Sequence, residues 1–104
     1  MADVFTVLAD PTRRRMLEVL REGERAVGEL VDEVDIEQSG VSRHLRIMRE
    51  AGFVSVRRDA QRRLYSVEPE PLRELDAWLA DYRQQWEESF EKVDAHLERR
   101  KEEQ

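Results

Sequence analysis

The stretch SGVSRHLRIMREAGFVSVRR, residues 39–58, contains two kinds of apolar periodicity. In its first half Val41, Leu45 and Met48 recur at spacings of four and three, which is typical of one buried face of a helix. After Gly52 the spacing changes to two, as expected for a strand. The stretch therefore predicts a helix that ends at Gly52 and passes directly into a β-strand.

Short helices are predicted before this stretch. Phe5 and Leu8 suggest a first helix, and Asp10 and Pro11 open the next, because Asp is a good N-cap and Pro suits the first helical position. AVGELVDEV, residues 26–34, has apolar residues at i, i+3, i+4 and i+7, which predicts a third helix.

Only about three residues separate this third helix from the helix that ends at Gly52. Two short helices joined in this way form a helix-turn-helix, here over about residues 26–51. The residues after Gly52 predict a β-hairpin, because FVSVRR and RRLYSVE both alternate and DAQ, residues 59–61, supplies a turn. A hairpin directly after a helix-turn-helix is a wing, here over about residues 53–67.

The last third of the chain predicts one long helix over about residues 70–101. Pro69 and Pro71 favour its start, and apolar residues recur at spacings of three and four from there. Alone, this helix would expose a long apolar stripe, so we expect part of the stripe to form a dimer interface. The stripe residues predicted at that interface are Leu75, Leu79, Tyr82, Trp86 and Phe90. The fold class is thus mainly α with a small β-hairpin, in a single domain over residues 1–104.

The charge distribution points to one function class. The whole chain has a formal charge of −6, which alone argues against nucleic-acid binding. Residues 37–63, however, hold seven arginines against three acids, a local charge of +4. Binding to DNA depends on the local charge that faces phosphate rather than on the total. This basic segment covers the helix and the hairpin that a winged helix-turn-helix would present to DNA.

The second helix of a helix-turn-helix reads base edges in the major groove with residues near its N-terminal end. Polar and small residues suited to this task lie at that end: Gln38, Ser39, Gly40, Ser42 and Arg43. Gln can pair with adenine and Arg with guanine, while the glycine permits close backbone approach. Arg46 is expected to contact phosphate, and His44 either contacts phosphate or is half-buried under the wing. The alternative is an ordinary solvated face whose arginine stems cover the core.

The predicted hairpin carries Arg57, Arg58, Arg62 and Arg63 around its turn. Arginine side chains fit narrow minor grooves and phosphate ridges. Because strand residues alternate in direction, we expect only about half of them to face DNA, and we predict contacts from Arg57, Arg62 and Arg63. A charged hairpin that resists aggregation is the alternative, and both roles can coexist.

Three segments, in this order and spacing, carry a family resemblance: LADPTRRRMLEVL, VSRHLRIMREAGFV and RRLYSVEPEPLRELDAWL. Over nearly its whole length the chain resembles the ArsR/SmtB family of bacterial winged-helix transcriptional regulators. The resemblance implies a homodimeric repressor on an inverted-repeat operator, with the first and last helices, including Phe5 and Leu8, at the dimer interface.

The family's DNA-reading positions correspond to residues already selected above, namely Gln38, Ser39, Ser42, Arg43, His44, Arg62 and Arg63. The chain departs from the family pattern in three places. Glu37 stands where a Ser N-cap is frequent, so Asp35 caps the helix or the helix starts raggedly. Gly40 replaces a frequent Thr or Pro, and the wing turn lacks the frequent Gly.

Many members of this family sense metals, but the residues here favour no metal or other cofactor. The chain has no cysteine, which excludes thiolate sites. Asp94 and His96 match the first half of a site on the last helix, and the sequence ends before the second half could occur. We expect both to lie on a solvated helix face. A small-molecule pocket lined by the aromatic residues of the last helix is a further alternative.

Other function classes find little support. No Gly-rich phosphate loop is present, and the two histidines are far apart, so we expect no enzyme activity. No segment is apolar enough to span a membrane and no signal peptide is recognisable, so we expect a cytoplasmic protein. The predicted partners are double-stranded DNA and a second copy of the chain. The alternatives are a winged-helix module that binds another protein through its acidic surface and a metal-responsive repressor that uses Asp94 and His96.

Overall fold

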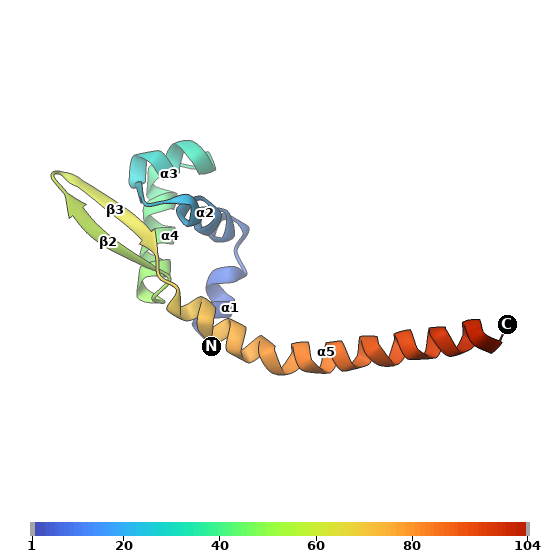
Figure 1. The fold of residues 1–104 in the computed structure, drawn as a ribbon. Coiled ribbons are helices and arrows are strands. Elements are labelled where there is room, and N and C mark those ends of the chain that lie inside the picture. Colours follow the sequence, from blue (N-terminus) through green and yellow to red (C-terminus); the bar gives the residue numbers. More distant parts are fainter. Residues whose placement is uncertain (1, 104) are drawn as a thin grey trace. The chain divides into compact units, whose positions relative to one another are not determined.

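A computed structural model of the chain describes the backbone of residues 2–103 and the side chains of residues 4–99 (Figure 1). The elements, in order, are α1 (Ala2–Leu8), α2 (Pro11–Glu22), β1 (Arg25–Ala26), α3 (Val27–Val34), α4 (Gln38–Glu50), β2 (Val54–Asp59), β3 (Arg62–Val67) and α5 (Glu70–Glu103). The predicted winged helix-turn-helix, mainly α with a small β-hairpin, is confirmed.

Helix α2 begins where the sequence predicts. The Asp10 side chain accepts hydrogen bonds from the backbone N–H groups of Thr12, at 2.8 Å, and Arg13, at 3.2 Å, so it caps α2. Burial raises the pKa of Asp10, but these bonds together with the nearby charge of Arg13 lower it below its usual value. Pro11 follows at the first helical position, where its missing N–H costs nothing.

Helices α3 and α4 are joined by a connection of three residues, as predicted for the helix-turn-helix. Asp35 ends α3 in the left-handed conformation with φ 54°, which Asp tolerates better than most residues. Glu37 is the N-cap of α4 but makes no side-chain capping bond. Helix α4 therefore starts without a side-chain cap. This agrees with the predicted ragged start and not with the alternative, a cap from Asp35.

The end of α4 leads directly into the wing. Gly52 has φ 78°, a conformation that glycine adopts without steric cost. The next residue, Phe53, is fully buried, donates its N–H to Met48 O at 2.8 Å and accepts the Glu68 N–H at 2.8 Å. Phe53 thus fastens both strands of the wing to the end of α4.

The sheet has three antiparallel strands in the order β1-β3-β2, one more than predicted. The extra strand, β1, has two residues and pairs Arg25 with Tyr65 and Ala26 with Leu64. The predicted turn of three residues, DAQ, is also wrong. Asp59 pairs with Arg62, so only Ala60 and Gln61 form the turn, and Ala60 takes the positive φ of 57° that a glycine would adopt more easily.

The four helices α1, α2, α3 and α4 share one apolar core with the sheet. Its buried residues are Val4, Val7, Met16, Leu20, Leu30, Val34, Val41, Leu45, Met48, Phe53, Val54, Leu64 and Tyr65. They include the predicted stripe of α4, whereas Phe5 of α1 is exposed.

The chain divides into two compact units, one up to Arg73 and one from Glu74. The first unit contains the winged helix-turn-helix and the first turn of α5. The second consists of the rest of α5, a single helix. The single domain predicted over residues 1–104 stays a prediction, and its end residues Met1 and Gln104 lie outside the described residues. Within the described part of the chain, no helix is long and apolar enough to cross a membrane.

Candidate nucleic-acid interface

Helix α4 has two faces of opposite character. Val41, Leu45 and Met48 are at most 1% exposed and hold the helix to the core. The outward face presents the predicted reading residues, all of them exposed: Gln38, Ser39, Ser42, Arg43 and Arg46. No ion-pair partner of Arg43 or Arg46 is found among the described side chains. The face therefore offers unpaired hydrogen-bond donors and acceptors in a row along one helix.

Gly40 lies on the partly covered side of the same N-terminal turn. A Cβ built at this position would meet Ile36 Cδ1 at 3.5 Å, an ordinary van der Waals contact. The fold itself therefore does not require glycine at position 40. The prediction that glycine permits a close approach of the backbone to DNA is compatible with this geometry.

His44 is buried, with 7% of its surface exposed. Its Nδ1 lies 3.3 Å from Nη1 of Arg13 in α2. Because a guanidinium only donates hydrogen bonds, Nδ1 has to accept, and the proton of the neutral ring lies on Nε2. Burial lowers the pKa of His44, and the charges of Arg13 and Arg43 lower it further against the opposing effect of Asp10. The hydrogen-bond contact of its ring is thus with α2, and burial disfavours a direct contact with phosphate.

Arg13 connects that histidine to α1. Besides contacting His44, its guanidinium donates to Val7 O at 3.0 Å and to Thr6 O at 2.8 Å. The guanidinium thereby satisfies carbonyl groups at the C-terminal end of α1, which no helical N–H reaches. Sequence reasoning did not single out Arg13, because nothing in its local pattern distinguishes it from Arg14 and Arg15.

The wing arginines divide into two pairs. The register pairs Arg58 directly with Arg63, so both lie on one face, whereas Arg57 and Arg62 lie on the other. Arg57 makes a two-fold contact with Glu24, just before β1: Nη2 to Oε1 at 2.6 Å and Nε to Oε2 at 3.0 Å. That contact lowers the pKa of Glu24 and raises the pKa of Arg57.

Arg62 has weaker acidic neighbours. Its guanidinium lies 3.9 Å from Glu29 of α3 and 3.9 Å from Asp59 of β2. Arg58 and Arg63 are exposed, and neither has an ion-pair partner among the side chains of residues 4–99. The expectation that about half of these arginines face DNA stays a prediction. Of the residues predicted to contact DNA, Arg57 and Arg62 lie beside acids, whereas Arg58, which has no acidic partner among the described side chains, was not selected.

The residues predicted for dimerisation are all at least partly exposed. Phe5, Tyr82, Trp86 and Phe90 are exposed, whereas Leu8, Leu75 and Leu79 are intermediate. Within α5 the aromatic rings follow one another along the helix. The ring centroids are 4.9 Å apart for Trp78 and Tyr82, and 6.2 Å apart for Tyr82 and Trp86.

The weak metal candidates lie further along α5. Asp94 and His96 are both exposed. Among the residues that the structure describes, no group of three or more His, Asp or Glu side chains is arranged to hold a metal ion.

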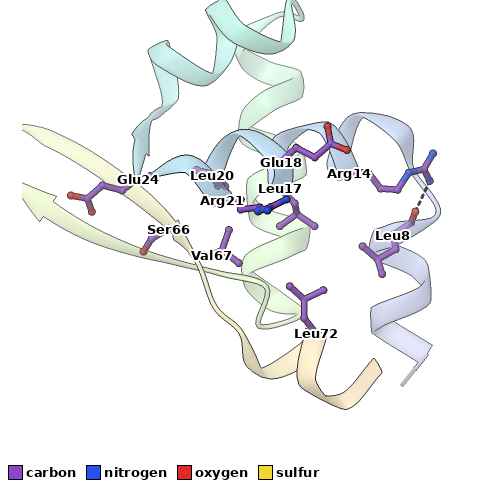
Figure 2. A pocket seen from close by; sticks show the side chains of 11 residues that line it. Leu8, Arg14, Leu17, Glu18, Leu20, Arg21, Glu24, Ser66, Val67 and Leu72 are labelled. Atoms are coloured by element: carbon purple, nitrogen blue, oxygen red, sulfur yellow. Dashed lines mark hydrogen bonds between the residues drawn. The ribbon is translucent and has the colours of Figure 1, made fainter. Parts of the chain in front are cut away.

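Residues outside α4 line a cavity in the first unit (Figure 2). It has a volume of about 570 Å³ and is formed by α1, α2, β3 and the first turn of α5. Leu17, Val67 and Leu72 point into it, and Arg14 donates to Leu8 O beside it at 2.6 Å. None of the residues predicted to read DNA lines this cavity.

Comparison with known proteins identifies the family. Residues 10–56 match the model of the bacterial regulatory protein, arsR family. An uncharacterised HTH-type transcriptional regulator of Mycobacterium tuberculosis is 43% identical over 71% of this chain, and the match spans 66% of that regulator, slightly under two thirds. The transcriptional repressor SdpR of Bacillus subtilis is 30% identical over 79% of this chain and 91% of its own length.

Solved structures agree with these matches. The crystal structure of the ArsR family transcriptional regulator RHA00566 has a TM-score of 0.73 and 31% identity, and the match covers 83% of this chain and 89% of that one. A homodimeric winged helix-turn-helix DNA-binding domain from Mycobacterium bovis, solved by NMR, has a TM-score of 0.65 and 27% identity, covering 85% and 82%. The matched relatives are transcriptional regulators, and this chain belongs to the ArsR family of bacterial regulatory proteins.

Proposed function

We propose that this protein is a homodimeric transcriptional repressor that binds an inverted-repeat site in double-stranded DNA. The outward face of α4 carries the proposal. It joins exposed Gln38, Ser39 and Ser42 to unpaired Arg43 and Arg46 on a helix whose opposite face is fixed in the core. These side chains suit base edges and phosphate in the major groove.

A dimer would present two copies of α4 to successive major grooves, about 34 Å apart, on a palindromic site. Two observations support a dimer. The apolar stripe of α5 includes exposed Trp86 and Phe90, and one solved structure similar to this chain is described as homodimeric. Such a repressor would act in the cytoplasm, where the chromosome lies, and would need no enzyme activity.

The first test is a selection of bound DNA from a random pool, followed by affinity measurements on the selected sequence. Arg43→Ala and Ser42→Ala should each weaken binding and relax the preference at one base position. Loss of a two-fold arginine contact to guanine should cost about 1–3 kcal/mol of discrimination. Arg49→Ala is the matched control, since Arg49 is exposed at the other end of α4. Unchanged affinity and preference in both Arg43→Ala and Ser42→Ala would show that α4 does not read the site.

Salt dependence separates DNA binding from the alternative of a protein-binding module. If arginines contact phosphate, the logarithm of affinity for the selected DNA should fall steeply and linearly with the logarithm of salt concentration. A protein without a sequence preference in the selection, and without this salt dependence, would favour the alternative.

A further inference from the structure

We propose that Glu24 positions the wing by holding Arg57, so that Arg57 orients the wing without touching DNA and the cross-strand pair Arg58 and Arg63 contacts DNA phosphate. The inference rests on the proposed DNA-binding function and assigns parts within it. It differs from the sequence prediction, in which Arg57 contacts DNA and Arg58 does not.

The contact joins segments that are 33 residues apart in sequence. Glu24 directly precedes β1, and β1 pairs only with β3. The two-fold bond to Arg57 therefore adds a second attachment of the α2–β1 connection, this time to β2. A carboxylate that meets a guanidinium through two parallel bonds fixes orientation as well as distance. Together the attachments hold both strands of the wing at one angle to the helix-turn-helix.

This ion pair is too exposed to stabilise the fold appreciably. The side chains of Arg57 and Glu24 are 58% and 37% exposed. Ion pairs exposed to this degree contribute little to the free energy of unfolding. An effect of Glu24 on DNA binding would therefore reflect where the wing lies rather than whether the protein folds.

Arg58 and Arg63, unlike Arg57, lie beside a like charge instead of an acid. They are directly opposite on neighbouring strands, an arrangement of like charges that destabilises a hairpin. No acid among the described side chains forms an ion pair with either of them. An anion between the two guanidinium groups would relieve the repulsion and accept hydrogen bonds from both, and a DNA phosphate has the required charge and acceptor geometry.

Charge reversal tests the positioning role. Arg57→Glu and Glu24→Arg should each weaken binding to the selected DNA about tenfold, because each places like charges together where a coupled pair stood. The effect of Glu24→Arg is the more diagnostic, since an added positive charge would otherwise strengthen DNA binding. The double variant Glu24→Arg/Arg57→Glu restores the pair in reverse and should bind within about threefold of the wild type.

The matched control reverses an arginine that is assigned to phosphate. Glu24→Arg should not rescue Arg58→Glu. If the double variant Glu24→Arg/Arg57→Glu binds as weakly as Arg57→Glu alone, then Arg57 touches DNA and the positioning role is overturned. Circular dichroism and thermal unfolding of each variant verify that the fold is intact.

Salt dependence gives a second, independent readout. Arg58→Ala and Arg63→Ala should each reduce the slope of log affinity against log salt by about 1.8, because the slope changes by about 0.9 for each lost phosphate contact and both copies in the dimer carry the change. Arg57→Ala should reduce the slope no more than Glu24→Ala does, because both variants act only by releasing the wing, and a larger reduction in Arg57→Ala would overturn the assignment. If binding of the wild-type protein to DNA does not depend on salt, the proposed function itself is overturned. If the wild-type protein binds as expected but the double variant Glu24→Arg/Arg57→Glu does not restore affinity, only the role of Glu24 is overturned.

Discussion

At the scale of single residues, His44 provides a pH-dependent contribution to stability. Its folded-state pKa is lowered from 6.5, first by burial and then by Arg13 and Arg43. Below pH 6.5 His44 is therefore protonated to a greater extent in the unfolded chain than in the folded protein. Because the unfolded state binds more protons, the free energy of unfolding should decrease as the pH falls from 6.5 toward 5. Asp10 and Glu24 stay ionised in this window, since their lowered pKa values lie beneath it.

Urea unfolding at several pH values measures this effect. His44→Asn retains an acceptor near the position of Nδ1 but has no proton to gain, so it should lose most of the decrease. His96→Asn, which changes an exposed histidine of α5, should retain the decrease. A decrease that is equally large in His44→Asn would assign the pH dependence to other groups.

At the scale of elements, the two helices of the helix-turn-helix offer matched glycines. A Cβ at Gly40 of α4 makes only an ordinary contact, and a Cβ at Gly28 of α3 meets nothing within 4 Å. Alanine lowers the backbone entropy cost of a helix, so Gly40→Ala and Gly28→Ala should each raise the free energy of unfolding by about 0.5–1 kcal/mol. If the backbone at Gly40 approaches DNA, only Gly40→Ala should weaken operator binding. Equal affinity of both variants for the selected DNA would remove that role from Gly40.

The wing shows what element-level reasoning could and could not predict. Alternation along β2 and β3 predicted a hairpin, and it predicted that half of its arginines share a face. A turn of three residues would pair Arg58 with Arg62, whereas the actual two-residue turn pairs Arg58 with Arg63. A shift of one residue changes which side chains share a face, so the sequence could not predict which of these arginines lie together. The length of the turn was hard to predict because the glycine that signals a two-residue hairpin is absent. Ala60 takes the positive φ in its place.

Contacts between elements far apart in the chain could not be predicted from the sequence for a different reason. Strand β1 has two residues, too few for any alternation to be recognised, and it exists because β3 supplies its hydrogen-bond partners. Glu24 likewise gains its role only when the fold brings it to Arg57. The helices, in contrast, could be predicted because their caps and apolar spacing are local: Asp10 before α2 and Gly52 after α4 act within one turn.

At the scale of the whole molecule, the described part of the second unit is a single helix whose apolar residues are exposed. From Glu74 onward, Trp86 and Phe90 are 50% and 68% exposed, and Val93 and Leu97 continue the stripe. A single helix cannot bury such a stripe against itself, and apolar surface of this kind is typical of an interface.

Trp86→Glu should therefore convert a dimer into a monomer. A large aromatic side chain near the centre of an interface often contributes at least about 2 kcal/mol, and a buried carboxylate adds a desolvation cost, so the dimer dissociation constant should rise by at least about 30-fold. Sedimentation equilibrium over a range of protein concentrations measures this constant. Gln84→Glu adds the same charge off the stripe of α5 and should leave the dimer intact, which separates an interface role from the effect of added negative charge. If Trp86→Glu sediments as the same dimer as the wild type, the interface does not include this part of α5, and the paired recognition helices of the proposed repressor would need a different dimer contact.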